Sequence, residues 1–148
     1  MILDEPYGEN TLEGTAELQL DFEKLLAGES RVLPVAVQNI KTGEVILIAY
    51  TNESAFMKTL MEKKAVFWST SRNEMWYKGD GSGNTFTVHE ILVNCEQNSM
   101  VYKVTPDKSN ICHVTSDGVA LNCYYRALDT GTMKLKMIME ESYEKPSV

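Results

Sequence analysis

The sequence predicts an α+β fold, mostly antiparallel β-sheet with one or two packed helices. One observation is a series of short β-rich segments separated by turn-forming residues, and another is that only two stretches space their apolar residues as a helix does. The chain has 148 residues and 43% hydrophobic content, which suits one domain that folds without disulfides. The expected strands are 32–40, 45–50, 65–69, 75–78, 84–95 and 101–105.

The first part of the chain is expected to form a short helix and then a hairpin. A helix is predicted over 18–26 because four apolar residues share one helical face before Gly28: Leu18, Phe22, Leu25 and Leu26. The two strands that follow are joined by residues 41–44, a turn sequence of hairpin length. We therefore expect these two strands to pair antiparallel.

A second helix is expected over 53–64, with Asn52 as its cap. Its first turn is acidic and its last turn is basic, as the helix dipole favours. The spacing of its residues predicts an inner face of Ala55, Phe56, Thr59 and Leu60. We expect this helix to serve packing.

The second half of the chain is expected to continue as sheet. In the long strand, alternate residues should share one face: Phe86, Val88, Glu90 and Leu92. A polar loop over 106–122 precedes a strand-like pattern at 123–126. The tail alternates and is expected to add an edge strand or to dock as an extension, through Met133, Leu135, Met137 and Met139.

Charge and composition exclude several classes of function. The net charge of −7 argues against a nucleic-acid partner, because such binding needs clustered Lys and Arg. No apolar run reaches the length of a membrane span, and the N-terminus lacks the pattern of a secretory signal, so we expect a cytoplasmic protein without membrane contact. In such a reducing compartment, the three cysteines are more plausible as thiolate ligands than as disulfides.

Residues 68–83 gather small hydroxyls, cations, glycines and aromatics, a mixture that suits a phosphorylated nucleotide. Hydroxyls can donate to phosphate or ribose oxygens, and glycines let backbone N–H groups approach closely. The alternative is a hairpin whose turn is merely polar. The candidate substrate-binding residues are Ser69, Ser71, Arg72, Trp76, Lys78, Gly79 and Ser82.

The cysteines stand at 95, 112 and 123, and no two form a C-x-x-C pair. Buried cysteines acting as small hydrophobic residues are the alternative to a metal site. Their polar neighbours favour the site, since Cys112 precedes His113 and Cys95 precedes Glu96. Three thiolates with an open fourth position would make a catalytic zinc site.

Several motifs, in order, resemble the phosphoribosyl-AMP cyclohydrolase family of histidine biosynthesis. Its members open the purine ring of phosphoribosyl-AMP by adding water across the N1–C6 bond. The resemblance covers about 33–126 and runs through TGEV, AYTN, WSTSR, WYKGDGSG, NCEQN, CH and CYYR. It divides the chain into an N-terminal extension (1–30), a cyclohydrolase-like domain (31–126) and a C-terminal extension (127–148).

The resemblance implies a homodimer with its active site near the interface. Cys95 of one subunit and Cys112 and Cys123 of the other would bind zinc, which activates the water that attacks C6 of the base. His113 would transfer a proton to the departing ring nitrogen, or would instead only orient a ligand. The implied partner is a small-molecule purine nucleotide.

The departures from the family fall at functional positions. Three aspartates bind magnesium in the family, whereas Asn94, Glu96 and Asn98 stand here, so Glu96 is the one remaining magnesium candidate and a family-type site is not expected. Two interpretations follow. The chain is a diverged zinc hydrolase of phosphoribosyl-AMP or another purine-type nucleotide, or it is a non-catalytic, zinc-stapled dimer that binds a nucleotide or a protein partner.

Overall fold

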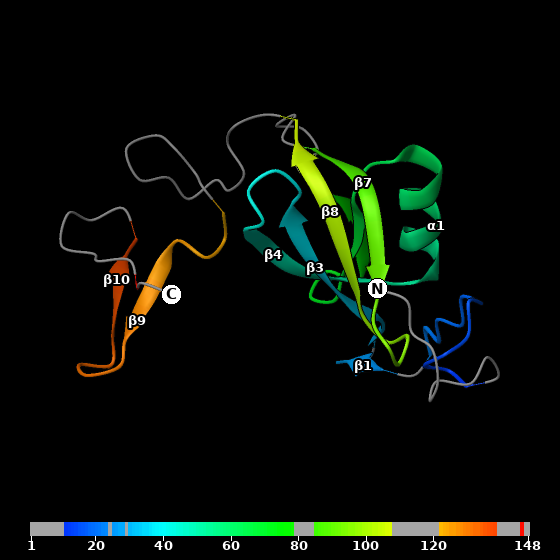
Figure 1. Ribbon diagram of the computed structural model, residues 1–148, viewed down its shortest axis with the longest axis horizontal. Coiled ribbons are helices and arrows are strands. Elements are labelled where there is room, and N and C mark those ends of the chain that lie inside the picture. Colours follow the sequence, from blue (N-terminus) through cyan, green and yellow to red (C-terminus); the bar gives the residue numbers. More distant parts are fainter. Residues whose placement is uncertain are drawn as a thin grey trace.

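The computed structural model describes residues 11–23, 25–28, 30–78, 85–107, 122–138 and 146. Its centre is a four-stranded sheet in the order β4-β3-β8-β7 (Figure 1). The strands are β3 (Leu33–Asn39), β4 (Val45–Thr51), β7 (Phe86–Val93) and β8 (Met100–Pro106). The outer pairs are antiparallel hairpins, and β3 and β8 are parallel in the middle. The predicted α+β class is confirmed, with one parallel pair inside a mostly antiparallel arrangement.

A smaller hairpin and one helix pack against this sheet to form the core. Strands β5 (Val66–Ser69) and β6 (Glu74–Tyr77) pair antiparallel, and β5 contacts both β4 and the helix α1 (Glu53–Glu62). The fully buried ring of Phe67 lies between Trp76, at 5.0 Å, and Tyr102, at 6.1 Å, measured between ring centroids. These aromatic contacts join the small hairpin to the central strand β8.

The helix α1 begins as predicted and ends slightly earlier. The Asn52 side chain accepts a hydrogen bond from the Ala55 N–H at 2.9 Å, so the predicted cap is confirmed. Lys63 stands at the C-cap with a φ of 60°, so the expected basic last turn is wrong. The inner face is confirmed for Ala55, Phe56 and Thr59, while Leu60 is 39% exposed.

The predicted alternation of β7 is wrong beyond Val88. The pairing with β8 shifts between Val88 and Glu90, because His89 is an extra residue that forms a bulge. After the bulge, Ile91 packs against the core, and Glu90 and Leu92 are turned away from it. Phe86 and Val88 occupy the core as predicted.

The helix predicted over 18–26 is wrong. Residues 18–21 have no regular secondary structure, and two short strands follow, β1 (Leu26–Ala27) and β2 (Ser30–Arg31). Gly28 has a φ of 64° in the turn between them, a conformation that glycine adopts without strain. The Glu17 carbonyl and the Gln19 N–H bond to the side chain of Gln97. These backbone groups are therefore paired without a helix.

The C-terminal region forms a separate hairpin of β9 (Arg126–Asp129) and β10 (Lys134–Met137), drawn away from the central sheet in Figure 1. The alternating tail therefore pairs with β9, not with the edge of the main sheet, and Met139 lies outside the described residues. The strand expected over 123–126 begins only at Arg126. Among the described helices, none is long and apolar enough to span a membrane.

Candidate active site

The turn between β5 and β6 brings three of the predicted substrate-binding residues together. Ser69 closes β5 and is 9% exposed, and its hydroxyl accepts a hydrogen bond from the Arg72 N–H at 3.2 Å. The Ser69 Oγ also lies 3.3 Å from Ser71 Oγ and 3.5 Å from Arg72 Nε. Ser69 therefore shapes the turn from inside, whereas Ser71 and Arg72 form its exposed side.

Arg72 carries the cation of this turn at the surface. Its side chain is 62% exposed, and its Nε lies 3.5 Å from a carboxylate oxygen of Glu74. Such an exposed pair contributes little to stability, so an incoming phosphate can displace the carboxylate at small cost and take a bidentate contact. The turn offers one hydroxyl and one guanidinium to an anion.

The remaining predicted binding residues divide into two groups. Trp76 packs on Phe67, so part of its ring serves the core, and Lys78 is half-buried at the end of β6. Gly79 and Ser82 lie outside the described residues.

The loop after β7 contains Cys95 and Glu96, together with Asn94 and Asn98. The Asn94 side-chain oxygen accepts from the N–H groups of Asn98, at 2.8 Å, and Ser99, at 2.9 Å. The Asn94 side-chain N–H donates to the Asn98 side-chain oxygen at 2.6 Å, and the Asn98 side-chain N–H donates to Glu96 Oε2 at 3.2 Å. Amide groups therefore close this loop on itself.

This set of donors does not fit magnesium. Magnesium requires near-octahedral oxygen coordination and favours carboxylates, and this loop holds one carboxylate, which already accepts a hydrogen bond. Three converging carboxylates would repel one another without a cation, whereas the amides supply both donors and acceptors. The loop has no electrostatic need for a metal ion.

The described cysteines fit zinc by their chemistry. Cys95 and Cys123 are both exposed, and sulfur is a ligand that zinc prefers. Cys112 and His113 lie outside the described residues. Within the part of one chain that the structure describes, no three His, Cys, Asp or Glu side chains are grouped so as to hold a metal ion.

The two described cysteines stand at opposite edges of the central sheet. The Cys123 N–H donates to the Ile46 carbonyl at 2.9 Å, beside the edge strand β4, whereas Cys95 follows the other edge strand, β7. The register places Ile46 level with about Ile91, and Cys95 comes four residues later. Three strand spacings separate β4 from β7, and Cys123 lies outside β4, so the two backbones are at least about 14 Å apart across the sheet. Two thiolates on one zinc lie only about 4 Å apart.

Asp107 fastens the end of β8 to the start of β7. Its N–H donates to the Thr85 carbonyl at 2.9 Å, and its carboxylate accepts from Lys64 at 2.6 Å, from Thr87 at 2.7 Å and from the Thr85 hydroxyl. Partial burial alone would raise the pKa of Asp107, but these hydrogen bonds outweigh it and hold the pKa below its ordinary value. The ionised carboxylate therefore stabilises this junction.

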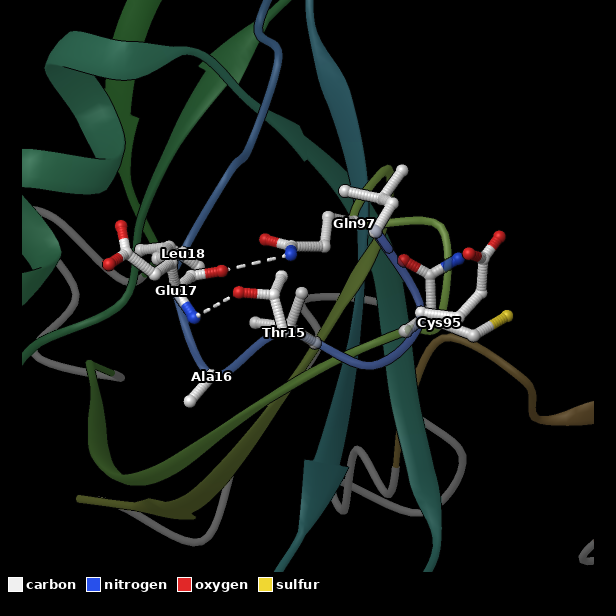
Figure 2. Close-up of a pocket in the computed structure, with 10 residues that line it drawn as sticks. Thr15, Ala16, Glu17, Leu18, Cys95 and Gln97 are labelled. Atoms are coloured by element: carbon white, nitrogen blue, oxygen red, sulfur yellow. Dashed lines mark hydrogen bonds between the residues drawn. The ribbon is translucent and has the colours of Figure 1, made fainter. Parts of the chain in front are cut away.

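Sequence reasoning missed Gln97, which is 7% exposed and has a φ of 51° in the Cys95 loop. Its side-chain amide binds the backbone of the N-terminal segment at Gln19 and at Glu17, the second contact being drawn in Figure 2. A glutamine in a polar turn gives no sequence signal for such a contact, because its partners lie about eighty positions away.

Comparison with known proteins gives consistent matches. The family model described as phosphoribosyl-AMP cyclohydrolase matches residues 47–125. A phosphoribosyl-AMP cyclohydrolase of Desulfotalea psychrophila is 37% identical over 78% of this chain and 86% of its own length. That of Methanothermobacter thermautotrophicus is 35% identical over 84% of this chain and 86% of its own. The histidine biosynthesis bifunctional protein HisIE of Thermus thermophilus is 35% identical over 84% of this chain and 56% of its own length.

Proposed function

Because the chain belongs to the phosphoribosyl-AMP cyclohydrolase family, we propose that it opens the adenine ring of phosphoribosyl-AMP at the N1–C6 bond in histidine biosynthesis. The observation that carries this proposal is the extent of the family match, residues 47–125. That range includes the turn at Ser69, all three cysteines and His113. The protein is an enzyme of the cyclohydrolase type, and its cytoplasmic location stays a prediction.

The substrate's phosphates and ribose would bind at the turn between β5 and β6. Ser71 and Arg72 are exposed there, and Ser69 supports the turn from within. Lys78 adds a second cation at the end of the same hairpin, followed in the sequence by Gly79 and Ser82. A guanidinium fork and a mobile ammonium suit a nucleotide that carries two phosphate groups.

Zinc would be held by Cys95 of one subunit and by Cys112 and Cys123 of a second copy. The separation of at least about 14 Å between the Cys95 and Cys123 backbones in one chain supports a site shared between two copies, since both could not ligate one ion within a chain. A bound zinc ion supplies Lewis-acid activation of water at this site. His113 would carry the proton to the departing ring nitrogen, because a histidine exchanges protons near neutral pH.

Turnover of phosphoribosyl-AMP by the zinc-loaded protein tests this proposal, followed by the absorbance change on ring opening. We expect turnover that is lost on chelation, lost in His113→Ala and unchanged by added magnesium. Absence of turnover from a protein that binds zinc and forms dimers would contradict the proposed activity.

The amide network at Asn94 and Asn98 favours a second candidate function. The resemblance to the family implies three aspartates in this loop, whereas this chain has two neutral amides bonded to each other beside one carboxylate. The second candidate is a paralogue that acts on another purine-type nucleotide, or a zinc-stapled dimer that binds one without turnover. Zinc-dependent nucleotide binding without ring opening would favour it.

A further inference from the structure

The side chain of Gln97 holds the N-terminal segment against the Cys95 loop. Its Nε2 donates to the Glu17 carbonyl at 3.0 Å (Figure 2). Its Oε1 accepts from the Gln19 N–H. One amide thus binds a donor and an acceptor two residues apart, as a neighbouring β-strand would. Thr15 secures the same segment, since its hydroxyl accepts from the Glu17 N–H at 3.0 Å.

A cavity of about 440 Å³ lies between this segment and the Cys95 loop. Leu12, Ala16 and Leu18 line it from the N-terminal segment, and Val93 and Cys95 line it from the end of β7 and the loop. That volume is in the range of small-molecule sites. The cavity therefore adjoins the thiol that the proposed function assigns to zinc.

The charge of this cavity selects against phosphate. Among the described residues that line it, none is cationic, and Glu13 and Glu17 carry carboxylates. Carboxylates repel a phosphate group, while the apolar side chains suit an uncharged ring system. The cavity is thus complementary to the base or ribose of a nucleotide. The phosphates would bind elsewhere, at the cations Arg72 and Lys78.

The same N-terminal segment reaches the proposed phosphate turn at its other end. Phe22 packs on Phe56 of α1, with ring centroids 5.8 Å apart. Further along, the Ser30 hydroxyl donates to the Asn73 side-chain oxygen and accepts from the Trp68 indole N–H, both at 3.4 Å. The segment therefore connects the Cys95 loop to the turn between β5 and β6.

We propose that residues 11–19 form a wall of the substrate cavity beside Cys95 and contact the uncharged base or ribose of the nucleotide. Gln97 is the positioning residue that holds this wall in place. The inference rests on the proposed function for the identity of the nucleotide, and on the contacts above for the docking of the segment.

Gln97→Asn is the variant that tests the proposal. Asparagine tolerates the positive φ of this position, so the turn is kept, but its amide is one methylene shorter and cannot reach both backbone partners. Gln38→Asn is the matched control, because the Gln38 amide donates to the Gly43 carbonyl at 2.9 Å in the hairpin of β3 and β4. The control makes the same change of side chain at a position that does not line the cavity.

Two measurements on the zinc-loaded full chain separate docking from substrate contact. Hydrogen exchange of the Gln19 N–H should become about two- to tenfold faster in Gln97→Asn, as the loss of one or two hydrogen bonds predicts, with β3 and β8 unchanged. KM for phosphoribosyl-AMP should rise about two- to tenfold with kcat little changed, because the wall binds the substrate without touching the reacting atoms. Gln38→Asn should change neither quantity.

Each contrary result overturns a defined part of the proposal. Unchanged exchange at Gln19 would contradict the positioning role of Gln97. Faster exchange with an unchanged KM would contradict the segment's contact with substrate. If the wild-type protein shows no turnover, the proposed function fails, and the affinity for AMP measured by calorimetry then tests the wall. Equal affinity of wild type and Gln97→Asn would overturn the contact between the wall and a nucleotide. Weaker binding by the variant would support that contact.

Discussion

Restoring two aspartates to the Cys95 loop should make the fold depend on magnesium. In the double variant Asn94→Asp, Asn98→Asp, the backbone N–H groups of Asn98 and Ser99 keep an acceptor at position 94, so the turn can still form. The two side-chain donors that now bond to Asn98 Oδ1, at 2.6 Å, and to Glu96 Oε2, at 3.2 Å, are removed. Three carboxylates then face one another in place of an amide network.

The expected loss follows from two terms. Each lost hydrogen bond contributes about 1 kcal/mol, giving about 2 kcal/mol for the pair. Like charges about 4 Å apart repel by about 1 kcal/mol per pair where water screens them well, and each lost hydrogen bond becomes one such pair. We therefore expect the free energy of unfolding to fall by about 4 kcal/mol in the absence of divalent cations. Magnesium at ten times its dissociation constant should return about 1.4 kcal/mol to the variant.

Urea unfolding of wild type and variant, each with chelator or with magnesium, measures these terms. Wild-type midpoints should coincide in the two conditions. The reasoning would be refuted if magnesium stabilised the wild type as much as the variant, since the existing amides would then be adequate ligands. A variant as stable as the wild type in chelator would show that the amide network contributes nothing.

Two further predictions concern stability. Thr59→Val should lower the free energy of unfolding by about 2 kcal/mol, because the buried Thr59 hydroxyl accepts from the Val66 N–H at 3.0 Å, and valine removes that acceptor; an unchanged urea midpoint would contradict it. Asp107→Asn should destabilise the fold at pH 7, where the Asp107 carboxylate is ionised. Because the pKa of Asp107 in the folded state is below the ordinary value of 3.8, the ionised carboxylate stabilises the fold above pH 3.8. This stabilisation is lost as the pH falls through the folded pKa, so the variant should then cost little. A loss that stays constant as the pH is lowered from 7 through the acidic range, measured by urea unfolding, would show that the charge of Asp107 is irrelevant.

Local sequence signals predicted the elements whose causes are local. Asn52 predicts the start of α1, because its side-chain oxygen accepts from an N–H of the first turn that has no partner within the helix. The turn over 41–44 predicts the hairpin of β3 and β4. Ser69, Ser71 and Arg72 also meet in one turn, because they are close in sequence.

Long-range contacts explain what sequence reasoning missed. Residues 18–26 have helical spacing, yet the Gln97 side chain supplies non-helical partners for the Glu17 carbonyl and the Gln19 N–H. The bulge at His89 depends on the register with β8, and the parallel pair of β3 and β8 joins strands about sixty residues apart. Local propensity carries no information about either contact.

Complementation between two inactive variants tests the shared zinc site most directly. Cys95→Ala and Cys123→Ala should each be inactive alone, because each lacks a ligand in both sites of the dimer. Mixed, exchanged and reloaded with zinc, they should recover about one quarter of wild-type turnover, since half of the dimers are heterodimers with one intact site of two. No recovery from a mixture shown to contain heterodimers would contradict a site built from Cys95 of one copy and Cys123 of the other.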